Sequence, residues 1–73
     1  MNKKILDLNK DIYEYDRIRK TAEAFAGLVD VDIVDENNRY KCVFTNFKLE
    51  SEKTIREFEN YLINLMNKSE EKN

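Results

Sequence analysis

The chain has no histidine, proline or tryptophan, and it has one cysteine and one glycine among its 73 residues. Because histidine is absent, the chain lacks the commonest zinc ligand and the commonest general base of enzymes. Cys42 is the only cysteine, so neither an intramolecular disulfide nor a cysteine-rich metal site can form. These absences argue strongly against a self-contained enzyme, and we expect a non-enzymatic protein without a cofactor or metal.

An excess of one charge and a long apolar run are also missing. Thirteen basic and fifteen acidic residues are interspersed along the chain, which gives a net charge of −2. Without an extended basic stripe to neutralise phosphates, nucleic-acid binding is not expected. No apolar run approaches the roughly 20 residues that span a bilayer, and the N-terminal segment does not resemble a signal peptide. We therefore expect a cytoplasmic protein that binds no membrane.

The length is near the lower limit for a chain that folds without disulfides or metals. Each buried core side chain contributes about 1.5 to 3 kcal/mol, against an ordering cost of about 1.5 kcal/mol per residue. The expected stability is marginal, which favours self-association or a stable partner. We expect one α+β domain over residues 1–66 and a polar, disordered tail over residues 67–73.

Three segments have the patterns of β-strands. Residues 4–8 predict a short strand in which Leu6 and Leu8 share one face and Ile5 points to the other. Residues 29–33 alternate between apolar and acidic side chains, and residues 39–47 are rich in β-branched and aromatic ones. The turn-forming residues 35–38 lie between the last two segments, which predicts a hairpin.

Two segments predict amphipathic helices. The first follows a turn at residues 9–11 and ends at Gly27, where a left-handed C-cap is expected because glycine has no Cβ. The second begins at an N-cap, Ser51, and ends at Met66. Apolar residues recur at helical spacing in both: Tyr15, Ile18, Ala22, Phe25 and Ala26, then Ile55, Phe58, Leu62, Leu65 and Met66.

The element order is therefore β-α-β-β-α. The right-handed crossover rule makes the first two strands parallel and places the third between them, antiparallel to both. This predicts a three-stranded sheet of order 1-3-2 with both helices on one face, a truncated ferredoxin-like fold. The ferredoxin-like pattern normally ends with a strand that pairs with the first strand. Its absence leaves the first strand as an open edge.

Two groups of side chains are candidates for chemistry. The carboxylates Asp30, Asp32, Asp35 and Glu36 do not have the spacing of a calcium loop, so we interpret them as a solvated strand face followed by a turn. Cys42 lies in the middle of a predicted strand without a histidine to activate it, so we interpret it as a small buried hydrophobe.

The open edge and the uncovered sheet face are the candidate binding surfaces. Backbone groups on the outer side of residues 4–8 have no expected partner within the chain, and an added strand can use them.

The sequence does not decide which side chains of residues 39–47 face the core. One alternating set is Tyr40, Cys42 and Phe44, and the other includes Val43 and Phe47. The uncovered face has residues apolar enough to form a patch: Ile5, Val34, Val43 and Phe47. The predicted partner-binding residues are Ile5, Leu6, Asp7, Leu8, Val43 and Phe47.

The stretch LDLNKDIYEYDRIRKTAEAF resembles the small HxsD-like proteins, which occur with radical-SAM enzymes in systems that modify His-Xaa-Ser repeat peptides. The likeness lies in a strand rich in leucine and isoleucine, in Ile12-Tyr13, and in a helix with Ile18, Ala22 and Phe25 at the family's spacing. The hairpin and a last helix with Phe58 and Leu62 extend it over nearly the whole chain.

This resemblance implies a non-catalytic accessory protein that assists the maturation of ribosomally made peptides. Its expected partners are a precursor peptide, a radical-SAM modifying enzyme, or both. The alternative is a stand-alone homodimeric ferredoxin-like domain with a regulatory or interaction role.

Overall fold

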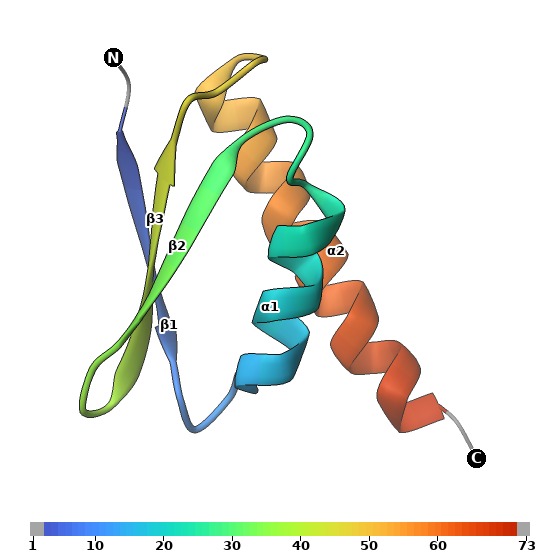
Figure 1. Cartoon of the computed structure of the whole chain (residues 1–73). Coiled ribbons are helices and arrows are strands. Elements are labelled where there is room, and N and C mark those ends of the chain that lie inside the picture. The colour runs from blue at the N-terminus through green and yellow to red at the C-terminus, as the bar shows by residue number, and fades with distance from the viewer. Residues whose placement is uncertain (1–2, 72–73) are drawn as a thin grey trace.

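The computed structural model describes residues 3–71, with side chains described as far as residue 67. Both helices lie on the same side of the sheet (Figure 1), which confirms the predicted α+β fold. The elements are β1 (Lys4–Asn9), α1 (Tyr15–Ala24), β2 (Asp30–Asp35), β3 (Arg39–Thr45) and α2 (Ser51–Glu71).

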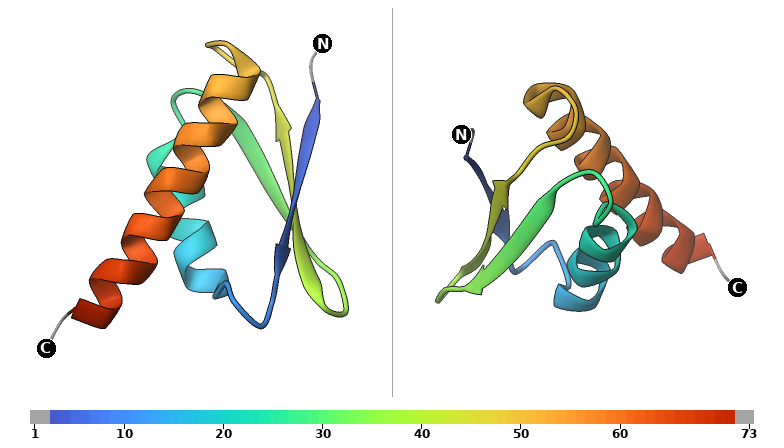
Figure 2. Two further views of the ribbon diagram at one scale, coloured as in Figure 1. Left: turned by 180° about the vertical axis from the view of Figure 1, so that it is seen from behind. Right: turned by 45° about the horizontal axis from the view of Figure 1, so that its top comes forward.

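The sheet has the predicted strand order β1-β3-β2, and β3 runs antiparallel to both neighbours. Leu6 of β1 lies opposite Cys42, which in turn lies opposite Ile33 of β2. Both β1 and β2 are therefore edge strands. Seen from behind, α2 lies in front of α1 (Figure 2), so α2 covers the β1 side of the sheet while α1 packs against β2.

The core lies between the helices and one face of β3. The Phe58 ring of α2 meets Phe25 edge-on at 5.5 Å between ring centroids and Phe44 at 4.9 Å. Cys42 and Phe44 are fully buried while Val43 is only partly so, which shows that Tyr40, Cys42 and Phe44 form the inward row. The buried apolar residues are Leu8, Ile18, Phe25, Val29, Cys42, Phe44, Phe58 and Leu62.

Phe47 does not extend the outward row of β3, so its predicted place on the open sheet face is wrong. Strand β3 ends at Thr45, and Asn46 has a φ of 55°, in the left-handed region that asparagine tolerates. The alternation of side chains stops there. Phe47 instead stacks on Phe44 at 6.2 Å and packs against the core.

The end of α1 also differs from the prediction. The helix ends at Ala24, and Gly27 does not have a positive φ. The N–H of Phe25 donates to the carbonyl oxygens of Thr21 and Ala22, and the N–H of Leu28 donates to Phe25. Because these turns use the last carbonyl groups of the helix, termination requires no left-handed glycine.

Both ends of α2 lie elsewhere than predicted. The N-cap role belongs to Glu50, whose Oε1 accepts a hydrogen bond from the N–H of Lys53 at 3.3 Å, and Ser51 is already helical. The helix also continues beyond Met66, its predicted end, as far as Glu71. Residues 67–71 contain neither glycine nor proline, which would interrupt it. The last two residues of the predicted tail, 72–73, lie outside the described residues.

We expect Phe58→Ala to lower the free energy of unfolding by about 3 to 5 kcal/mol, because the ring is fully buried against both Phe25 and Phe44. Urea denaturation followed by circular dichroism measures the loss. Glu57→Ala, at an exposed position in the same turn, is the control and should change it by less than about 0.5 kcal/mol. Equal stability of the two variants would contradict this packing.

Candidate functional site

The hairpin between β2 and β3 determines which backbone groups face outward from each edge of the sheet. The N–H of Glu36 donates to the carbonyl oxygen of Arg39 at 3.0 Å across the loop 37–38. Hydrogen-bonded and non-bonded pairs alternate along an antiparallel ladder. The backbone groups of Asp32 therefore point at β3, whereas those of Val31 and Ile33 point outward.

The same alternation assigns the backbone groups of β1. Those of Leu6 and Leu8 point at β3, where these residues lie opposite Cys42 and Tyr40, and those of Ile5 and Asp7 point outward. No backbone hydrogen bond within residues 3–71 reaches the outer groups of Ile5 or Asp7. The predicted open edge is therefore present. Ile5 and Asp7 supply its donors and acceptors, while Leu6 and Leu8 turn their side chains toward the helices.

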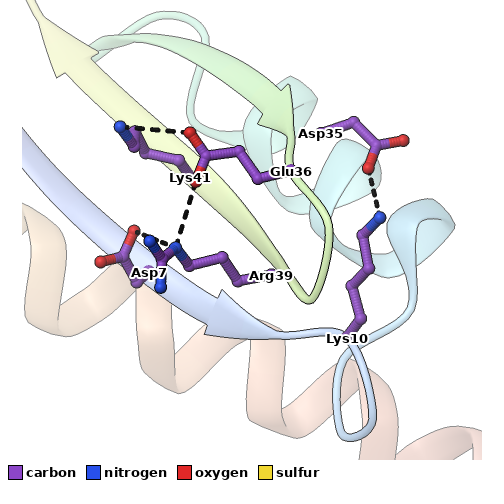
Figure 3. Close-up of polar contacts among 6 residues, drawn as sticks. All are labelled: Asp7, Lys10, Asp35, Glu36, Arg39 and Lys41. Atoms are coloured by element: carbon purple, nitrogen blue, oxygen red, sulfur yellow. Dashed lines mark hydrogen bonds and ion pairs between the residues drawn. The ribbon is translucent and has the colours of Figure 1, made fainter.

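The open sheet face carries a small apolar patch beside a cluster of charges. Ile5 and Val34 are 53% and 41% exposed, and Val43 lies opposite Ile5 in the sheet. At the hairpin end, Glu36 accepts a hydrogen bond from Arg39 Nε at 3.1 Å and lies 3.3 Å from Lys41 Nζ (Figure 3). Arg39 and then Lys41 lower the pKa of the Glu36 carboxyl group by these contacts. The patch is thus bounded by ion pairs on this side.

A second ion pair fixes the turn that follows β1. Lys10 Nζ forms an ion pair and hydrogen bond with Asp35 at the end of β2 (Figure 3), and it also lies 4.9 Å from the centroid of the Tyr40 ring.

The carboxylates Asp30, Asp32, Asp35 and Glu36 do not converge on a common site. Within the described part of the chain, no three side chains of the metal-ligating types lie close enough to hold an ion.

A groove separates α1 from the outer edge of β2. It has a volume of about 610 Å³, and Val31 and Ile33, both partly buried, contribute to it from the strand. Ala22 and Ala26 contribute from the helix side, and their short side chains leave this space unfilled. The other residues that line it are Tyr15, Arg19, Glu23, Val29, Asp30, Asp32 and Thr45.

Sequence reasoning missed this groove because alanine at helical spacing was interpreted only as core packing. Two signals were available before the structure. The predicted strand order 1-3-2 makes β2 an edge as well as β1, and the helix that precedes β2 has small residues where a bulky one would close the gap. The candidate functional site therefore consists of two unlike edges: β1, with a hollow of about 230 Å³ beside Asp7 and Asn9, and β2, with the groove of about 610 Å³.

Cys42 has the environment of a structural residue. Its side chain is fully buried in the middle of β3, which confirms its interpretation as a small buried hydrophobe. Burial, together with the negative charge of Asp7, raises the pKa of the thiol from 9.0 to about 12. The thiol is therefore protonated at neutral pH, and a protonated thiol is a poor nucleophile.

Comparisons with protein-family models, with curated proteins and with solved structures found no match. The resemblance to the HxsD-like proteins therefore stays a prediction. Within residues 3–71, no helix combines the length and the apolar character needed to cross a membrane. The two sheet edges are the features of the molecule that bear on function.

We expect the stability of the protein to fall as the pH rises from 9.0 toward 12, partly because of Cys42. In this range the unfolded thiol loses its proton while the folded thiol keeps it, so ionisation favours the unfolded chain. Denaturation curves of wild type and Cys42→Ala measure the effect. The difference between the two should stay constant below pH 9.0 and shrink above it. A constant difference over the whole range would contradict the raised pKa.

Proposed function

We propose that this protein is a non-catalytic binding module that holds an extended polypeptide segment in the groove between α1 and β2. The observation that carries the proposal is the pair of residues Val31 and Ile33, whose outward backbone groups border this groove. An added strand pairs with such groups through its own main chain, while pockets beside the strand select its side chains. The groove supplies both features at one place.

The charges of the groove favour a basic segment. Arg19 is its one cationic lining residue, and it already forms an ion pair with Glu23. Asp30 and Asp32 add two further carboxylates, of which Asp30 also accepts a hydrogen bond from Asn46 at 2.7 Å. A segment that alternates apolar residues with lysine or arginine matches both this charge and the two-residue period of an added strand.

Peptide maturation is the process in which we place this module. The resemblance to the HxsD-like proteins supports an accessory role beside a radical-SAM enzyme, and a precursor peptide is an unfolded chain that can enter an open groove as a strand. The segment belongs to the precursor peptide or to the modifying enzyme. Binding rather than catalysis is favoured because the chain has no histidine and its one thiol is buried with a raised pKa.

Filling the groove should abolish binding of such a segment. Ala26 is exposed and lines the groove, so Ala26→Trp should obstruct it without disturbing the core. A fluorescent peptide of alternating valine and lysine is the probe, with fluorescence anisotropy as the measurement. We expect Ala26→Trp to weaken binding at least about tenfold, equivalent to about 1.4 kcal/mol. Ala24→Trp is the matched control, because Ala24 is as exposed as Ala26 and close to it in the chain but does not line the groove.

Two further measurements identify the mode of binding. Hydrogen exchange of the Val31 and Ile33 amides should slow when the peptide binds, since these N–H groups would become donors to the added strand. A peptide of alternating valine and glutamate should bind more weakly because of the carboxylates in the groove. Equal affinity of Ala26→Trp and wild type, or unchanged exchange at both amides, would refute the proposal.

A further inference from the structure

The edge of β1 differs from that of β2 because it borders only a smaller hollow of about 230 Å³, which Asp7, Asn9, Asn38 and Arg39 line near the hairpin. Its outward backbone groups belong to Ile5 and Asp7, and its open-face side chains include the exposed Ile5. In the ferredoxin-like pattern an additional antiparallel strand would lie beside β1. We propose that β1 of a second copy of this chain takes that place, pairing antiparallel about a two-fold axis.

The side chains select one register for this pairing. Antiparallel pairing through the outward groups requires that residues 3, 5 and 7 of one chain lie opposite residues of the same set. With Ile5 opposite Ile5 of the second copy, each Lys3 lies opposite an Asp7. The dimer then has two cross-strand ion pairs flanking one apolar pair, all on the open face.

The neighbouring registers lack this complementarity. A shift of two residues places Asp7 opposite Ile5, and a shift of four places Asp7 opposite Asp7. The first leaves an apolar side chain against a carboxylate, and the second opposes like charges, which is destabilising across strands. The opposite charges at positions 3 and 7 therefore specify the partner strand and also its alignment.

The layer of helices is also suited to a second copy. Tyr61 of α2 turns toward the end of α1, where its ring centroid lies 5.7 Å from that of Phe25 in the turn after the helix. Ile63 is two residues further on, about 200° around the helix, so it turns away from α1 toward the β1 side. It is 44% exposed there. Two copies joined at β1 would bring the Ile63 sides of their α2 helices toward each other. Both the sheet and the layer of helices would then continue from one copy to the next.

Exchanging the charges tests the dimer and its register together. Sedimentation velocity of the full chain gives the oligomeric state. Wild type should dimerise, while Lys3→Glu and Asp7→Lys should each raise the dissociation constant at least about tenfold, because each places like charges opposite one another twice. The double variant should restore dimerisation. Asp7→Lys also removes the 3.9 Å contact between Asp7 and Arg39, whereas Lys3→Glu leaves it in place. If both single variants weaken the dimer equally, loss of that contact is not the cause.

A disulfide provides a test that does not depend on charge. Hydrogen-bonded antiparallel pairs have Cα atoms about 5.5 Å apart, which a disulfide can span. Ile5→Cys should therefore form a covalent dimer under mild oxidation, and Cys42 cannot compete because it is fully buried. Val34→Cys is the control: it is exposed on the same sheet face but belongs to β2, and it should stay monomeric on a denaturing gel.

The outcomes are distinct from those of the groove experiment. Ala26→Trp should leave the oligomeric state unchanged, and Lys3→Glu should leave peptide affinity unchanged, because the two edges lie on opposite sides of β3. Circular dichroism verifies that each variant is folded. A monomeric wild type, a double variant that stays as weak as the single ones, or equal cross-linking of Ile5→Cys and Val34→Cys would overturn the proposal.

Discussion

The edge-on packing of Phe58 against Phe25 and Phe44 joins all the layers of this small protein. One ring comes from α2, one from the turn after α1 and one from the central strand β3. Edge-to-face contacts favour a restricted set of ring orientations. The rings therefore fix the distance and direction of both helices relative to the sheet. The position of α1 in turn leaves the space beside β2 open, because the short side chains of Ala22 and Ala26 do not fill it.

Much of the fold could be predicted because the periods of the sequence are unambiguous in places. The strict alternation in residues 29–33 specified a strand, and the handedness of the crossover specified where it belongs. The inward row of β3 could not be predicted, since apolar residues occupy both of its faces. Phe47 was misplaced because one left-handed residue, Asn46, stops an alternation that the residue types alone would continue.

The candidate site was predicted only in part, for a related reason. An open edge follows from the topology, so β1 could be identified, but the ladder pattern that selects Ile5 and Asp7 depends on the hairpin loop. The groove depends on how far apart a helix and a strand come to lie, which no local pattern records. Gly27 illustrates the converse: its type suggested a left-handed cap, yet the helix ends before it in turns that need no left-handed residue.

The strand order also has a consequence for how the molecule opens. Strands β2 and β3 are joined by a tight hairpin, whereas β1 pairs with residues far along the chain, Leu6 with Cys42 for example. Closing so long a loop costs more conformational entropy than closing a hairpin. Loop-closure entropy thus makes β1 the strand that detaches with the least loss of local structure. A molecule bound to the outer side of β1 stabilises the state in which that strand is attached to the sheet. Binding at this edge and folding of the core are therefore coupled.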